Sequence, residues 1–321
     1  MRSFFFTFCF LILADLNHAQ TCCSGGVPLS NNIGLSFLDK GAYQIGLFYD
    51  YNNLNTLNEG TKVLNDNSRL RITNSILLNF SYNFTDRLLG EGLFTWVNQQ
   101  REITLGNNVN FDETFGIGDA ILLLRYMLVK EEYSSLIIGA GGKIPLGSTE
   151  EVNSLGILLN ADLQPGSNAF DFIFTSTYTT IFDFRKSLQF HARATYRDTG
   201  INSSYLGSSE YKFGNEFQMF VGATDSFLVW KQLVNPSLVF KYRNAQMDQL
   251  DTNNVANTGG EWIFMNPSVT IALSPKINFS TRVEIPIYSN VTGVQLTPTY
   301  RINTGITFQF GNKRRNESLL N

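Results

Sequence analysis

Charged residues are scarce in this sequence. Asp, Glu, Lys and Arg make up 16% of its 321 residues, whereas soluble domains carry about a quarter. The net charge is −3 and no long Lys/Arg tract is present, so nothing indicates a nucleic-acid partner. Beyond the N-terminus, no run approaches the roughly 18 to 20 consecutive apolar residues of a membrane helix, which excludes a helical membrane protein.

Cysteine and histidine are nearly absent as well. Cys9 and His18 lie within the first 20 residues, which leaves Cys22, Cys23 and His191 in the rest of the chain. Two adjacent thiols cannot form a disulfide framework, and they leave open either lipidation of Cys22 or an oxidised pair. A single histidine cannot build a His-rich metal site, so we expect no metal and no other cofactor.

The N-terminus reads MRSFFFTFCFLILADLNHAQ. Arg2 supplies a positive n-region, and Phe4 to Ala14 supply an apolar h-region, as is typical of a secretory signal. We expect cleavage near Ala19 or Gln20, so residues 1–20 form a signal peptide and the remainder is exported.

Alternation of apolar and polar side chains is the dominant pattern. The stretch from Tyr300 to Phe310 reads YRINTGITFQF. Successive side chains of a strand point to opposite faces, so one face suits lipid and the other suits water. A one-residue slip would turn Arg193, Arg282 and Arg301 toward lipid, where each costs about 2–4 kcal/mol, so their lumen-facing register is strongly specified.

The same alternation predicts about twelve strands. They lie near 42–54, 69–84, 88–100, 114–129, 134–145, 169–183, 186–198, 210–223, 227–243, 261–274, 276–288 and 295–310. Short and long connections alternate between them, as in barrels that have short periplasmic turns and longer outside loops.

The predicted fold is therefore an all-β, transmembrane antiparallel up-and-down β-barrel over residues 40–310. We expect it in the outer membrane of a diderm bacterium, surrounded by lipid and inserted by the barrel-assembly machinery. Residues 21–39 would form a periplasmic N-terminal segment or a plug, and residues 311–321 a periplasmic tail. The longest loop, near 146–168, is either an inward-folded lid or an exposed loop.

Residues on the expected lumen face are the candidate solute contacts. Two patterns on this face predict different solutes. The many arginines favour anions. Ile117, Ile121 and Leu123, which follow Phe115, would suit an apolar solute. The candidates are Phe115, Asp119, Arg125, Lys143, His191, Arg193, Arg282, Glu284 and Arg301.

Three stretches carry a resemblance to a known family. They read FGIGDAILLLRYM from Phe115, GAGGKIPLG from Gly139 and LQPGSNAFDFIFTSTY from Leu163. In this order and spacing the chain resembles the outer-membrane transporter family of the phenol meta-degradation pathway, and the resemblance runs from about Gly34 to Phe310. The stretch TCCSGG from Thr21 resembles barrels of the Bacteroidetes type. The resemblance implies a channel for hydrophobic or aromatic solutes.

The leading functional prediction is passive uptake of small solutes through the lumen, without catalysis. One alternative is a structural or surface-contact barrel that acts through its loops. The other is a barrel-wall lipid hydrolase, for which His191 would be the base.

Overall fold

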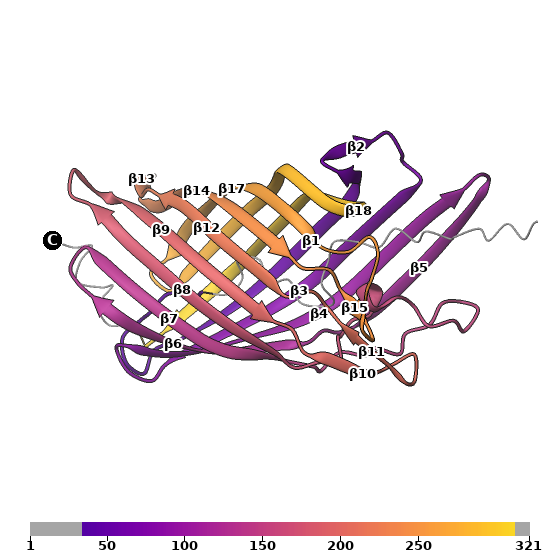
Figure 1. The fold of residues 1–321 in the computed structure, drawn as a ribbon. Coiled ribbons are helices and arrows are strands. Elements are labelled where there is room, and N and C mark those ends of the chain that lie inside the picture. The colour runs from indigo at the N-terminus through magenta and orange to yellow at the C-terminus, as the bar shows by residue number, and fades with distance from the viewer. Residues whose placement is uncertain (1–33, 312–321) are drawn as a thin grey trace, which may run out of the picture.

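The computed structural model describes residues 34–311, and its fold is a closed antiparallel β-barrel (Figure 1). Around the ring, β12, β9, β8, β7, β6, β4, β3, β1, β18, β17 and β14 follow one another, and β14 pairs with β12 to close it. Closure leaves the ring without an unpaired strand edge, as is required of a sheet that contacts lipid. No helix in the described part of the chain is long and apolar enough to cross a membrane.

The strands match most of the predicted ranges. They are β1 (Tyr43–Gly60), β2 (Lys62–Leu64), β3 (Arg69–Asn83), β4 (Leu88–Leu105), β5 (Asn108–Ile117), β6 (Ala120–Lys130), β7 (Ser134–Ile144), β8 (Asp171–Phe182), β9 (Arg185–Asp198), β10 (Ile201–Tyr205), β11 (Ser209–Lys212), β12 (Glu216–Thr224), β13 (Phe227–Val229), β14 (Gln232–Ala245), β15 (Gln249–Leu250), β16 (Asn253–Asn254), β17 (Gly260–Ser274) and β18 (Ile277–Phe310), with one 3₁₀ turn, η1 (Ala161–Leu163).

The ring has eleven named strands rather than twelve because β18 crosses it twice. Residues 277–291 pair with β17 and residues 291–310 pair with β1, both antiparallel. The chain reverses near Gly293, whose φ of +75° suits glycine. The expected count of about twelve is reached only when the two halves of β18 are counted separately.

Three predicted strand boundaries are wrong. The range 114–129 is two strands, because the chain breaks between β5 and β6 at Gly118 and Asp119. The range 210–223 is also divided, since β11 belongs to a separate four-stranded sheet with β10, β15 and β16. The range 227–243 is divided as well, because β13 forms a small hairpin with β14.

The two ends of the barrel differ. Short connections such as 84–87, 131–133 and 275–276 lie at one end, which we call the turn end. Long connections lie at the other, the loop end, where β10, β11 and β15 gather away from β13 (Figure 1).

Side chains alternate between a polar interior and an apolar outer face. In β6, Leu122 and Leu124 are exposed whereas Ile121, Leu123 and Arg125 are buried. Outward apolar side chains form a continuous band around the ring, as lipid contact requires. It includes Leu47, Ile76, Leu122, Leu124, Phe172, Phe174, Met219, Phe240, Ile302 and Phe308.

Candidate functional site

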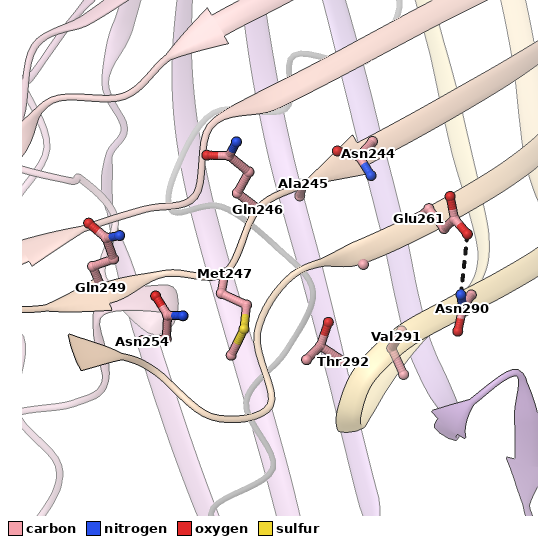
Figure 2. Close-up of a pocket in the computed structure, with 11 residues that line it drawn as sticks. Asn244, Ala245, Gln246, Met247, Gln249, Asn254, Glu261, Asn290, Val291 and Thr292 are labelled. Carbon is pink, nitrogen blue, oxygen red and sulfur yellow. Dashed lines mark hydrogen bonds between the residues drawn. The ribbon is translucent and has the colours of Figure 1, made fainter.

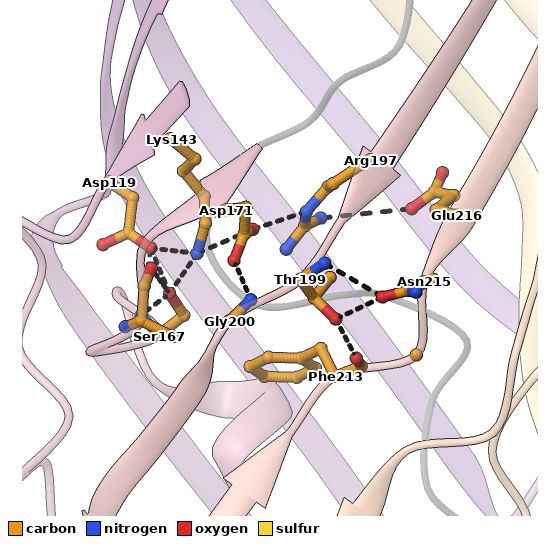
Figure 3. Close-up of polar contacts among 12 residues, drawn as sticks. Asp119, Lys143, Ser167, Asp171, Arg197, Thr199, Gly200, Phe213, Asn215 and Glu216 are labelled. Carbon is orange, nitrogen blue, oxygen red and sulfur yellow. Dashed lines mark hydrogen bonds and ion pairs between the residues drawn. The ribbon is translucent and has the colours of Figure 1, made fainter. Parts of the chain in front are cut away.

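A belt of alternating charges crosses the inner wall near the loop end (Figure 3). Lys143 Nζ lies 2.8 Å from Asp119 and 3.2 Å from Asp171. Arg197 Nε lies 2.6 Å from Asp171, and its Nη1 lies 4.0 Å from Glu216. Arg243 extends the row, with Nε 2.8 Å from Glu216. All these groups are buried, and every charge is next to the opposite one, as burial in a low dielectric demands.

Three sequence motifs meet at one end of this belt. Asp119, from the break between β5 and β6, accepts hydrogen bonds from the Gly147 N–H at 3.2 Å and from the Ser167 N–H and Oγ at 3.1 and 2.6 Å. Lys143 donates to Asp119 and to Ser167. The glycine-flanked Gly-Asp, Lys-x-Pro and Gln-Pro-Gly stretches therefore build one polar junction, although they lie far apart in sequence.

Backbone contact at this junction requires glycine. A Cβ on Gly166 would lie 2.3 Å from the Gly147 oxygen, and one on Gly147 would lie 2.6 Å from the Gly166 Cα. Neither distance is compatible with a side chain, so the two segments touch only because both residues lack one.

Part of the long connection between β7 and β8 folds into the barrel, which agrees with one of the two alternatives for this loop, while residues such as Leu155 remain exposed. The segment from Ala161 to Ser167 is buried. Asp162 forms an ion pair with Arg71 of β3 at 2.7 Å. Gln99 Nε2 donates to two carbonyls of the segment at 3.2 and 3.1 Å, and Thr114 Oγ1 donates to the Leu163 carbonyl at 2.6 Å. We call residues 161–167 the inward loop.

A second segment enters the barrel at the turn end. The N–H groups of Gly34 and Leu35 donate to Glu91 Oε1 at 2.8 and 3.2 Å, and Arg125 Nη1 donates to the Leu35 carbonyl at 2.7 Å. Gln44 Nε2 donates to the Ser36 carbonyl at 2.6 Å. Residues 34–38 thus lie against the inner wall. Residues 21–33 of the predicted segment 21–39, including Cys22 and Cys23, lie outside the described residues.

A polar chamber of about 200 Å³ lies between residues 34–36 and the inner wall of the barrel. Side chains of β1, β3, β17 and β18 line it, and most carry amides or hydroxyls. The lining includes Gln44, Phe48, Asn79, Thr270, Asn278, Ser280, Arg282, Asn303, Thr307 and Gln309.

An apolar cluster fills the interior next to this chamber. Leu77, Leu93, Ile121, Leu123 and Ile173 pack together from four strands, and Phe48 packs against them. All except Phe48 are almost fully buried. The cluster is therefore close-packed, and the chamber meets it at the ring of Phe48.

The predicted lumen residues fall into separate groups. Asp119 and Lys143 belong to the belt, whereas Arg125 pairs with Glu91 at 3.4 Å and not with Asp119. Glu284 pairs with Lys241, and Arg301 pairs with Asp50, each at 2.8 Å. His191, Arg193 and Arg282 form a further group, in which the two guanidinium groups repel each other and act on the His191 ring.

Phe115 is not in the lumen, and the expectation for Ile117 is also wrong. Their side chains are 69% and 53% exposed and lie opposite Asn98 and Trp96 on the outer face of β4. The break at Gly118 and Asp119 changes which positions face inward, so Ile121 and Leu123 are inside as expected while the two preceding apolar residues are not.

Sequence reasoning missed Glu91 and Asp162. Glu91 stands between two glycines in an otherwise apolar stretch, LLGEGLFTWV, and that isolated acid was a usable signal. Asp162 had no such signal, because its partner Arg71 lies 91 positions away.

A second cavity of about 540 Å³ lies at the loop end, between the ends of β14, β17 and β18 and the connection after β14 (Figure 2). Asn244, Glu261 and Asn290 form a cross-strand row along it. They alternate with the inward-facing Arg243 and Trp262, so this row faces the outside of the barrel. Ala245 and Val291, which pack with Trp262, also line it, so the cavity lies at the rim of the barrel.

A protein-family comparison identifies the chain. The family described as "Putative MetA-pathway of phenol degradation" matches residues 54–231, which is more than half of the sequence and contains all three motifs that meet near Asp119. The chain belongs to this family. A search of curated proteins found no match.

A solved structure shows the same fold. An outer membrane channel from Pseudomonas putida F1 is similar with a TM-score of 0.67 and 14% identity, over 88% of this chain and 100% of that one. The β domain of a Bordetella autotransporter has a TM-score of 0.46 and 10% identity, over 85% of this chain and 100% of that one. Together with the apolar outer band, the family and the fold make this protein a β-barrel of the bacterial outer membrane.

Proposed function

We propose that the barrel is a passive channel for small solutes, with its turn end in the periplasm and its loop end outside. The observation that carries this proposal is the polar chamber between residues 34–36 and the wall of β1, β3, β17 and β18. A barrel that served only as a scaffold could fill this space with apolar side chains. The family description supports solutes of aromatic degradation pathways.

Two elements would restrict the path. The inward loop crosses the interior near the loop end, where Arg71 and Gln99 hold it. Residues 34–38 occupy the interior near the turn end, where Glu91 and Arg125 hold them. Conduction therefore requires a solute small enough to pass beside both, or movement of one of them.

The test is single-channel recording of the full mature protein, refolded and inserted into planar bilayers. We expect discrete openings of small conductance, since both elements narrow the lumen. Heat-modifiable migration on gels would verify that the inserted protein is a folded barrel. Absence of any conductance from folded, inserted protein would contradict the proposal.

A structural barrel is the second candidate, and one observation favours it. The apolar cluster of Leu77, Leu93, Ile121, Leu123 and Ile173 blocks part of the interior with close-packed side chains. This candidate predicts a silent bilayer and effects of mutation confined to the loop end.

A lipid hydrolase receives less support. Among residues 34–311, no hydrogen bond joins His191 to a serine hydroxyl, and the charged groups that act on its ring are Arg193 and Arg282. A general base in a Ser-His pair needs a hydroxyl within hydrogen-bond reach. Hydrolysis is therefore not part of the proposed function.

A further inference from the structure

Arg282 differs from the basic residues around it. Lys241 and Arg301 each lie 2.8 Å from a carboxylate, and Arg125 lies 3.4 Å from Glu91. Arg282 makes no hydrogen bond or ion pair with any other residue between 34 and 311, and its buried Nε lacks an acceptor. A guanidinium with five donors is costly to leave unsatisfied away from bulk water.

The carboxylates that act on Arg282 are already committed. Glu284 and Asp50 attract its charge, but Glu284 is paired with Lys241 and Asp50 with Arg301. Arg193 also repels Arg282. Because both attracting carboxylates are paired with other cations, an anion entering the chamber would gain a charged partner in Arg282.

The chamber offers two different surfaces to a ligand. Arg282 and the amide and hydroxyl side chains, among them Asn278, Ser280 and Thr307, line its polar side. Phe48 lines the side next to the apolar cluster. A volume of about 200 Å³ suits one small organic molecule, given that a water occupies about 30 Å³ of liquid.

We propose that this chamber is a binding site for small carboxylates that carry an apolar or aromatic body. The guanidinium of Arg282 would bind the carboxylate in a bidentate manner, which is the geometry that the planar fork favours. The body would lie toward Phe48. This inference deepens the proposed channel function by naming its solute class, and it rests on that function only for how the solute arrives.

The same arrangement accounts for the two conflicting sequence patterns. Arg282 on the lumen face favours an anion, and Phe48, which packs against the apolar cluster, offers an apolar surface. An aromatic carboxylate satisfies both because its two ends differ. A neutral aromatic would leave Arg282 without a partner, and a bare inorganic anion would leave Phe48 without contact.

Equilibrium binding tests the site without relying on conduction. Benzoate is the probe, benzyl alcohol is its neutral counterpart, and the protein is the full mature chain in detergent. We expect the wild type to bind benzoate at least about tenfold more tightly than benzyl alcohol, because a charged hydrogen-bond pair is lost with the alcohol. R282Q should lose about tenfold or more in benzoate affinity, and R282K should recover part of it.

A matched control removes a charge elsewhere. Arg185 lies at the turn end in an exposed ion pair with Asp225, so R185Q should leave benzoate affinity unchanged. Heat-modifiable migration establishes that each variant is folded. Wild-type protein that takes no benzoate, equal affinity for the two probes, or benzoate affinity unchanged in folded R282Q would each overturn the proposal.

Bilayer recordings separate this inference from the channel function. A silent bilayer with benzoate binding intact refutes the channel and leaves the carboxylate site standing. A conducting barrel that benzoate blocks no better than benzyl alcohol retains the channel and refutes the site. Block by benzoate that disappears in R282Q supports both.

Discussion

At the scale of single residues, the interior is governed by charge pairing. Lys143 lies between Asp119 and Asp171, and both carboxylates are as buried as the ammonium. Removing the ammonium would leave two like charges facing each other in a low dielectric. Removing a charge from an exposed pair costs far less, because water screens it.

We therefore expect Lys143→Met to destabilise the barrel by about 3–5 kcal/mol, the range for breaking a buried ion pair. The measurement is the midpoint of urea unfolding in lipid vesicles. Lys186→Met is the control, because this lysine is exposed near the turn end, and its effect should stay within about 0.5 kcal/mol. Equal stability of the two variants would show that the ion pairs of the belt do not stabilise the folded barrel.

A pair of titratable side chains at the four-stranded sheet of β10, β11, β15 and β16 gives a second prediction at the scale of single residues. Tyr211 Oη donates to Asp248 Oδ2 at 2.6 Å, and the Gly214 N–H donates to Oδ1 at 2.8 Å. Burial raises the pKa of Asp248, and the charge of Asp162 raises it further, against the hydrogen bonds from Tyr211 and Gly214. Burial also raises the pKa of Tyr211.

A carboxyl with a raised folded pKa contributes stability below its unfolded pKa, and that contribution is lost as pH rises through the folded pKa. The four-stranded sheet should therefore be more protected just below pH 4 than at pH 7. Hydrogen exchange of β11 and β15, corrected for intrinsic rates, measures this. Asp248→Asn should abolish the difference, and a pH dependence that survives in this variant would exclude Asp248 as its source.

At the scale of elements, the inward loop is the main feature that periodicity could not place. Strands such as β7, β9 and β17 follow their predicted ranges closely, because alternation and lipid contact fix them locally. The loop depends on Arg71 meeting Asp162 and on Gly147 meeting Gly166, and neither contact leaves a local trace in sequence. The same holds for the break at Gly118, which reversed the faces of Phe115 and Ile117.

Asp162→Asn should loosen the inward loop, because Arg71 then loses its charged partner. If the loop restricts the channel, single-channel conductance or open probability should rise severalfold. Leu155→Ala is the control, since this side chain is 80% exposed at the tip of the same connection. Unchanged conductance in folded D162N would mean that the loop lies outside the path.

At the scale of the whole molecule, the two faces of the barrel wall have different environments. The outer face contacts lipid, and the inner face must satisfy buried polar groups. Neighbouring positions of one strand therefore need side chains of opposite polarity. Leu124 is exposed in the middle of β6, whereas Leu123 beside it is buried in the apolar cluster. Sequence could predict this division through most of β6, because its register shift lies near the end of the strand, between Met127 and Val129.

Leu124→Arg places a charge on the outer face, where Arg costs about 2–4 kcal/mol near the bilayer midplane. The loss should appear as a lower unfolding midpoint in lipid vesicles and should shrink when the lipid is replaced by detergent, which admits water more readily. Leu155→Arg adds the same charge at the loop end and should have no such effect. A variant L124R that is as stable in vesicles as the wild type would mean that this face of β6 does not contact lipid, and the membrane orientation of the barrel would have to be revised.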